Sequence, residues 1–143
     1  MGWDRYFFKL GAIVVIPAIV LLSYLNSIDN AFQYDDYHSL VENPHIKDIE
    51  NVPLFFVDSR LFSEDRRSFM YRPVVLATYA ITNHLNPDLL PSGFRWLNII
   101  VHTCNAVLVC VLVVQICGKP WIGLAAGLLF GLHPGNSEVV NYI

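Results

Sequence analysis

Two acidic side chains, Asp35 and Asp36, stand next to each other a few residues after a long apolar stretch. Adjacent carboxylates change each other's proton affinity, so that one of them can serve as a base that removes a proton from a hydroxyl group. Carboxylates close to a membrane are also costly to hold without a purpose. A solvated turn or helix start is the structural alternative, and both interpretations stay open at this point.

Arg72 and the pair His133 and Glu138 are the other candidates for chemistry. The guanidinium group of Arg72 matches phosphate oxygens in a bidentate fork, so it could bind a phosphate; an anchor to lipid headgroups is its structural alternative. His133 and Glu138 supply an imidazole and a carboxylate, but two ligands do not make a metal site. Their structural alternative is the start of a helix that is capped by Asn136 or Ser137.

The composition of the 143 residues indicates a membrane protein. Hydrophobic residues make up 55% of the chain and charged residues only 15%, whereas roughly a quarter of the residues of a soluble domain are charged. The net charge of −3 and the lack of a basic cluster exclude an electrostatic binder of nucleic acid. The many apolar residues and the low net charge exclude a disordered chain.

Three apolar stretches must position the candidate residues: 10–28, 96–117 and 120–133. A stretch of about 19 helical residues is about 28 Å long, which is enough to cross the hydrocarbon core of a bilayer. The second stretch contains His102 and Asn105 on one helical face, which predicts a hydrogen-bonding pair directed at another helix. The third repeats small residues at helical spacing, so we expect it to pack closely inside a larger helix bundle.

The basic residues that flank these stretches predict the topology. Arg5 and Lys9 precede the first stretch and Lys119 lies in the tight turn between the second and third, so the positive-inside rule places all three on the cytoplasmic side. The N-terminus is then cytoplasmic, and the loop 29–95 and the tail 134–143 lie outside. The expected fold is a single all-α integral membrane domain over the whole chain, with three transmembrane helices and a long extracytoplasmic first loop.

We expect short interfacial helices within this loop. Residues 53–62 have the pattern of an amphipathic helix that lies on the membrane surface. Residues 74–85 predict another helix, with Val74 and Ile81 on an apolar face opposite Thr82. This helix is too short and too polar to cross a bilayer, which favours an interfacial or re-entrant position.

Five short motifs follow one another along the chain: FQYDD, ENPHI, the helix that begins YRPVVLATYA, GFRWLNIIVH, and LLFGLHPGNSEVV. In this order and spacing they resemble the N-terminal part of the multi-pass O-mannosyltransferases that carry tetratricopeptide repeats, and of their bacterial relatives. These enzymes belong to the GT-C class of glycosyltransferases, which use lipid-phosphate sugars. The resemblance begins at Ala31 and implies a GT-C-like partial fold, in a chain that is the N-terminal part of a longer protein.

The resemblance also implies an activity, the transfer of a sugar such as mannose from a polyprenyl-phosphate donor to a hydroxyl acceptor outside the cytoplasm. It maps the catalytic base onto the acidic pair, with Asp35 as the base and Asp36 as its support. Arg72 is the expected cation for the leaving phosphate. The last motif maps onto His133 and Glu138, whose role in binding the acceptor, the phosphate or a divalent metal stays open. The family's pattern HP-[VI]-H-T-E has a second histidine that this chain lacks.

The resemblance reaches both the bacterial plasma membrane and the endoplasmic reticulum membrane. The expected partners are membrane lipid, the polyprenyl-phosphate sugar, an acceptor protein or glycan, and further membrane helices or a partner chain. The alternative function is a non-catalytic membrane subunit or assembly element, which the small-residue face around Gly127 favours. A transporter component has little support, because the three apolar stretches hold no formal charge.

Overall fold

The computed structural model describes residues 3–33, 36–62 and 70–142, and the side chains from residue 12 onward within them. These residues form helices of several kinds, and no strand occurs among them. Asp35 lies outside the described residues. The all-helical character that the sequence predicts is therefore confirmed for the described part of the chain.

The chain divides into two compact units. Unit 1 consists of Met1–Ile28 and Asn98–Asn141, and unit 2 of Asp29–Leu97 and Tyr142–Ile143. Asp36 and Arg72 belong to unit 2, whereas His133 and Glu138 belong to unit 1.

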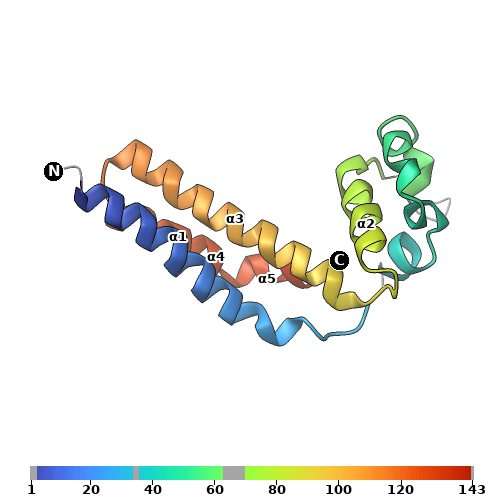
Figure 1. The fold of residues 1–143 in the computed structure, drawn as a ribbon, viewed down its shortest axis with the longest axis horizontal. Coiled ribbons are helices and arrows are strands. Elements are labelled where there is room, and N and C mark those ends of the chain that lie inside the picture. The colour runs from blue at the N-terminus through green and yellow to red at the C-terminus, as the bar shows by residue number, and fades with distance from the viewer. Residues whose placement is uncertain (1–2, 34–35, 63–69, 143) are drawn as a thin grey trace. The chain divides into compact units, whose positions relative to one another are not determined.

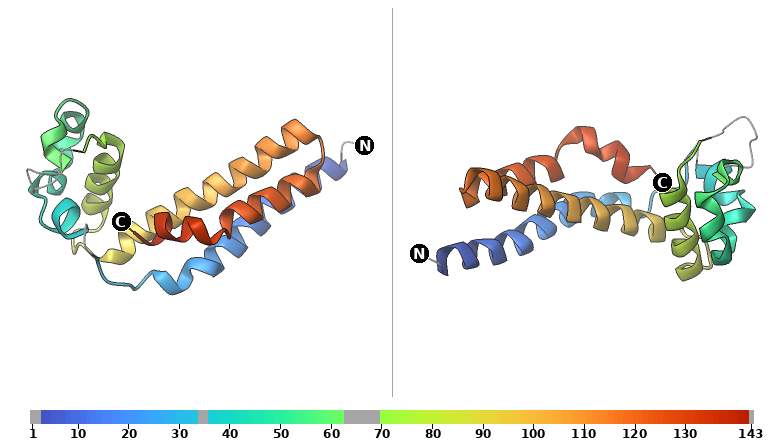
Figure 2. Two further views of the ribbon diagram at one scale, coloured as in Figure 1. Left: turned by 180° about the vertical axis from the view of Figure 1, so that it is seen from behind. Right: turned by 90° about the horizontal axis from the view of Figure 1, so that it is seen from above.

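Unit 1 is a bundle of helices that lie side by side in Figure 1, with α1 antiparallel to α3 and parallel to α4. Both views in Figure 2 show the same arrangement. The helices are α1 (Trp3–Tyr24), the part of α3 (Pro91–Cys117) from Asn98 onward, and α4 (Pro120–Gly131). A short η1 (Leu25–Ser27) extends α1, and η6 (Pro134–Asn136) and α5 (Ser137–Asn141) follow α4.

One stripe of α1 is buried in this bundle. Its members recur every fourth residue: Ala12, Ile16, Val20 and Tyr24. Residues four apart lie on the same face of a helix, so one row of side chains faces the core while the rows beside it stay exposed. Leu22, for example, is 70% exposed.

A tight turn joins α3 to α4. Gly118 adopts a φ of +68°, and its N–H donates to the carbonyl of Val114 at 2.9 Å. Glycine is favoured at this place because a left-handed residue ends a helix and only glycine has no Cβ to clash there. Pro120 then begins α4 at a position where no hydrogen-bonding N–H is needed.

The small-residue face of α4 packs against the other two helices of unit 1. A Cβ added at Gly123 would lie 2.6 Å from the carbonyl oxygen of Cys110, and one at Gly127 would lie 2.8 Å from both the carbonyl oxygen of Ala106 and Cδ1 of Ile16. The close approach of helices that the small residues predict is therefore seen at these glycines, where the neighbours are α1 and α3; a larger bundle stays a prediction. The observation that favoured an assembly element is thereby explained within the chain itself.

Among the described residues, α3 is the one helix long and apolar enough to cross a membrane. Only 28% of its most apolar window is buried within the molecule, so most of that surface faces outward. Two further apolar helices are shorter, Ala12–Ser27 and Pro120–Gly131. The structure therefore shows one membrane-capable helix, and the three-span topology stays a prediction.

Unit 2 packs α2 (Pro73–Leu85) against a series of short helices. In Figure 1 this region runs from cyan through green to yellow. The short helices are η2 (Tyr37–Val41, a π-helix), η3 (Pro44–Lys47), η4 (Ile49–Phe56) and η5 (Ser59–Phe62). The buried apolar residues of this unit are Leu40, Ile46, Phe55, Phe62, Leu76, Ala80 and Phe94.

A fully buried amide, that of Asn43, connects these short helices. Its Nδ2 donates to the carbonyls of Ser39 at 3.2 Å, Leu61 at 3.1 Å and Phe62 at 3.2 Å. Its Oδ1 accepts from the N–H of His45 at 2.9 Å. Short helices leave many backbone groups without helical partners, and this side chain satisfies several of them.

Two expectations for the loop differ from the structure. The single helix over 53–62 is broken at Asp58, because the Asp58 carboxylate accepts the N–H of Arg60 at 3.0 Å and starts a new turn there. In α2, Thr82 is buried at 8% exposure, whereas Val74 is 65% exposed. The polar side of this helix is thus buried at Thr82, although Ala80 of the apolar face is buried as well, and the helix itself is confirmed.

Candidate functional site

Asp36 is the described member of the acidic pair, and its side chain is buried at 1% exposure. Its carboxylate oxygen Oδ2 accepts the N–H of Gln33 at 2.8 Å. Its own N–H donates to the carbonyl of Gln33, also at 2.8 Å. These two hydrogen bonds join Gln33 and Asp36, the described residues nearest to Asp35 in the sequence. A carboxylate held this way suits a supporting role better than a freely accessible base.

Arg72 lies immediately before α2 and is exposed. Its guanidinium carbon stands 5.8 Å from the centre of the Phe62 ring, in a cation–π arrangement. Its carbonyl accepts the N–H of Leu76 at 3.1 Å, which fixes the backbone at the start of the helix. The cation is thus held over an apolar ring, with its exposed donors available to an anion.

Tyr79 connects Asp36 and Arg72 electrostatically. The pKa of its phenol is raised to about 12, first by burial and then by the negative charge of Asp36, while the positive charge of Arg72 acts in the opposite direction. The ring packs edge-on against Phe94, with the ring centres 6.1 Å apart. At neutral pH the phenol is therefore a protonated hydrogen-bond donor in the field of a carboxylate and a guanidinium. Tyr79 is not recognisable from the sequence, since an isolated tyrosine in a helix carries no motif.

Arg95 is a further residue that the sequence patterns did not reveal. It lies near the start of α3 and is 1% exposed. Its Nη1 donates to the carbonyl of Asn30 and its Nη2 to that of Ala31, the latter at 2.9 Å. The negative charge of Asp36 acts on its guanidinium. The available signal was its place in the motif GFRWLNIIVH, directly before the apolar stretch 96–117. A charged residue at that place is also what the end of any membrane span would have.

His133 and Glu138 are exposed at the end of unit 1 that follows α4. His133 Nδ1 accepts the N–H of Gly135 at 3.0 Å and so caps η6. The Nδ2 of Asn136 donates back to the carbonyl of Phe130 at 2.8 Å. A short helix therefore does begin after His133, as the structural alternative to a metal site predicts. The side chain that caps it is His133, however, and not Asn136 or Ser137; Asn136 instead binds a carbonyl at the end of α4.

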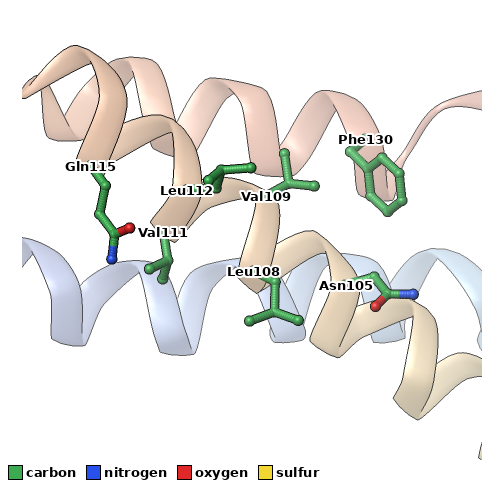
Figure 3. Close-up of a pocket in the computed structure, with 7 residues that line it drawn as sticks. All are labelled: Asn105, Leu108, Val109, Val111, Leu112, Gln115 and Phe130. Atoms are coloured by element: carbon green, nitrogen blue, oxygen red, sulfur yellow. The ribbon is translucent and has the colours of Figure 1, made fainter.

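His102 and Asn105 have different environments. His102 is buried, and its Nε2 lies 3.0 Å from the carbonyl oxygen of Gly131. The prediction of a contact between helices is therefore confirmed for His102. Asn105 is exposed and lines a groove of about 550 Å³ (Figure 3). The residues around this groove are Asn105, Leu108, Val109, Val111, Leu112, Gln115 and Phe130. With two amides and otherwise apolar side chains, its lining offers no group for acid–base chemistry.

No group of three or more histidine, cysteine, aspartate or glutamate side chains gathers within the described residues at a spacing that would hold a metal ion. His133 and Glu138 therefore stand without a third described ligand. Asp36 with Tyr79, Arg72 and Arg95 supplies a carboxylate, a phenol and two guanidinium groups within unit 2, a set suited to proton transfer and to anions.

Comparison with known proteins shows that the chain resembles protein O-mannosyl-transferases. It is 28% identical over 139 residues to the human protein O-mannosyl-transferase TMTC3 and 30% identical over 147 residues to the mouse TMTC4. It is also 30% identical over 131 residues to tmtc2 of Xenopus laevis. These matches cover 92%, 89% and 88% of this chain. The resemblance that the motifs indicate is thus confirmed.

The chain spans a small part of these relatives, 14% of TMTC3, 19% of TMTC4 and 15% of tmtc2. No family model matches the chain, and no solved structure matches it.

Proposed function

We propose that this chain contributes the acidic and phosphate-binding part of a glycosyltransferase that moves a sugar, mannose by analogy with its relatives, from a polyprenyl-phosphate donor to a hydroxyl group. The acceptor is a protein or a glycan on the extracytoplasmic side of a membrane. The observation that carries the proposal is that the buried carboxylate of Asp36 and the exposed guanidinium of Arg72 both act on the phenol of Tyr79, in a chain whose relatives are named protein O-mannosyl-transferases.

In the proposed reaction, Asp35 accepts the proton of the acceptor hydroxyl. The hydroxyl oxygen forms a bond to the anomeric carbon of the sugar, while the bond from that carbon to the phosphate oxygen breaks. The electron pair of the broken bond stays on the lipid phosphate, and the anomeric carbon inverts. This is a single displacement with a general base, and the base is expected to contribute a factor of about 10²–10⁴ to the rate.

The buried carboxylate of Asp36 supports the assignment of the base to its neighbour. Asp36 is bound to Gln33 by two hydrogen bonds, and Asp35 stands between these two residues in the sequence. Asp36 then fixes the loop, and its charge disfavours a second ionised group nearby, which raises the basicity that Asp35 needs.

Arg72 supports the departure of the phosphate. Negative charge develops on the phosphate oxygens as the bond breaks, and an exposed guanidinium that is already held over Phe62 can bind them without reorganising. The phenol of Tyr79 remains protonated at neutral pH, because its pKa is raised to about 12 by burial and by Asp36. It supplies a neutral donor for a sugar hydroxyl or a phosphate oxygen.

In this proposal α1 and α4 also cross the membrane beside α3, with the N-terminus in the cytoplasm. The two apolar helices are shorter than α3, but Arg5 and Lys9 lie in the first turns of α1, before its apolar part, and the turn before α4 contains Lys119. His133 and Glu138 would then lie on the same side of the membrane as the acidic loop. The membrane is that of the endoplasmic reticulum or the bacterial plasma membrane.

The experiment that tests the function is sugar transfer by the full-length protein in membranes, from a radiolabelled polyprenyl-phosphate mannose to a serine- and threonine-containing peptide. Asp35→Asn is expected to lower kcat by about 10²–10⁴-fold, and Asp36→Asn to lower it less. Asp48→Asn is the matched control, because Asp48 is exposed and caps η4 through a bond to the N–H of Glu50 at 2.9 Å. Asparagine preserves such a cap.

Transfer that is unchanged in Asp35→Asn would remove the assignment of the base. A wild-type protein that transfers no sugar from this donor, although it is correctly inserted, would contradict the proposed function as a whole.

A further inference from the structure

We infer that Arg95 is the positioning residue of the acidic loop: its buried guanidinium fastens the backbone that leads to Asp35 and Asp36 onto the first turns of α3. The inference rests on the proposed function, because it assigns a role to Arg95 through the loop that carries the base.

The two hydrogen bonds of Arg95 carry the argument. Nη1 donates to the carbonyl of Asn30 and Nη2 to the carbonyl of Ala31. Two donors of one planar group on two successive carbonyls hold both the place and the direction of the backbone. A single donor would leave the segment free to rotate about one bond.

The residues that follow continue this attachment up to the acidic pair. The ring of Phe32 packs edge-on against Phe94, the neighbour of Arg95, with the ring centres 6.2 Å apart. Gln33 is joined to Asp36 by two hydrogen bonds of 2.8 Å, one in each direction. Four successive residues, 30 to 33, are thus held by α3 or by Asp36, and the acidic pair follows them in the sequence.

The burial of the Arg95 guanidinium costs free energy, because the charge loses its hydration. Arg95 is 1% exposed, and its Nε has no hydrogen-bond partner among the described residues. A buried guanidinium is stabilised only by good hydrogen bonds and by opposite charge, which the two carbonyls and the negative charge of Asp36 supply. Such buried charges are concentrated at functional sites.

The same burial excludes direct contact between Arg95 and a substrate, so its effect must pass through the loop. Among the described residues, the charged and titratable groups that act on Arg95 or Tyr79 are Asp36, Tyr79 of α2, and Arg72 just before α2. Arg72 is exposed and suited to binding an anion, whereas Arg95 is buried and suited to holding the backbone. The two arginines thus have different proposed roles: Arg72 binds the anion, and Arg95 positions the backbone.

The test uses the full-length protein in membranes, with Arg95→Gln, Arg95→Lys and the matched control Arg60→Gln. Arg60 is an exposed arginine of the same unit that binds only its neighbour Asp58 among the described residues. Two quantities are measured: hydrogen exchange of the amides of Gln33 and Asp36, and kcat and KM for sugar transfer. Neither variant of Arg95 changes a group that we place against the substrate.

For Arg95→Gln we expect exchange at Gln33 and Asp36 to rise about tenfold, as the loss of a hydrogen bond predicts. We expect kcat to fall by about 100-fold with KM for donor and acceptor unchanged, because a misplacement of the base by about 1 Å has that effect. Arg95→Lys should recover part of kcat, since it keeps the charge and one donor. Arg60→Gln should match the wild type in both measurements.

Unchanged exchange at Gln33 and Asp36 in Arg95→Gln would overturn the inference. So would faster exchange with a preserved kcat, or faster exchange that extends over η3 and η4, since these results indicate a merely structural residue. If the wild-type protein transfers no sugar, the proposed function fails, and the exchange measurement still decides whether Arg95 holds the loop.

Discussion

His102 on α3 donates a hydrogen bond through Nε2 to the main-chain carbonyl of Gly131 on α4, at 3.0 Å. The donor must be the imidazole, because a carbonyl oxygen only accepts. Gly131 is the last residue of α4, where the carbonyls have no partner within the helix. The side chain of one helix therefore satisfies the end of another, and the rings of Tyr24 and Phe130 enclose it at centre distances of 5.5 Å and 5.4 Å.

Replacing His102 by leucine should destabilise the bundle by about 1–3 kcal/mol, because the carbonyl of Gly131 stays buried without a donor. Thermal unfolding of the purified protein in detergent measures this loss. Asn105→Leu serves as the control, since Asn105 is exposed in the groove of Figure 3. If both variants unfold at the wild-type temperature, the hydrogen bond contributes nothing measurable.

The titration of Tyr79 should report its charged neighbours. Its pKa is raised to about 12 by burial and then by Asp36, with Arg72 opposing. Asp36→Asn should therefore lower this pKa, and Arg72→Gln should raise it, as followed by NMR of ring-labelled tyrosine. Shifts in the reverse directions, or no shift in either variant, would contradict the arrangement.

The same pKa predicts how Tyr79 affects stability at high pH. A group whose pKa is higher in the folded state contributes stability that is complete below its unfolded value, near 10, and is lost as the pH rises through about 12. As the pH rises from 10 to about 12, the free energy of unfolding of Tyr79→Phe should accordingly fall less than that of the wild type.

Gly127→Ala should lower the stability of unit 1 by about 1–3 kcal/mol, because the new methyl group would overlap the backbone of α3. Its Cβ would lie 2.8 Å from the carbonyl oxygen of Ala106 and from Cδ1 of Ile16. Gly118→Asn is the contrasting variant: nothing lies within 4 Å of a Cβ there, and asparagine tolerates a positive φ. Equal stability of the two variants in a thermal melt would refute this account of the packing.

Arg72→Gln should raise KM for the polyprenyl-phosphate donor and lower kcat by about 10²–10³-fold, if the guanidinium stabilises the leaving phosphate. Arg72→Lys should recover only part of the activity, because an ammonium group lacks the bidentate fork. Arg60→Gln provides the matched loss of one exposed positive charge in the same unit. A similar loss in Arg60→Gln would indicate an effect of net charge and not of this site.

Local patterns predicted a good deal of the helical structure. The helix over 74–85 begins at Pro73 and ends at Leu85 as its proline and its apolar run indicate. The acidic pair and Arg72 were also visible as candidates before any fold was known. Local rules suffice for such features because helix propensity, proline and glycine act within a few residues.

The partners of these residues could not be predicted in the same way. Thr82 of α2 is buried and Val74 exposed, because the short helices of unit 2 approach a side of α2 that its own sequence does not specify. Asn43 binds carbonyls at Leu61 and Phe62, which are 18 and 19 residues away. No periodicity in the sequence encodes these distances.

The helical character of the chain, its richness in apolar residues suited to a membrane, and the resemblance of its motifs to the O-mannosyltransferases all follow from the amino-acid sequence alone. The neighbours of Asp36 do not: Arg95 reaches carbonyls that lie 65 and 64 positions earlier in the chain. Hydrogen bonds and charges act over a few ångströms in space, whatever the separation along the chain. Such contacts exist only once the path of the backbone has brought the two segments together.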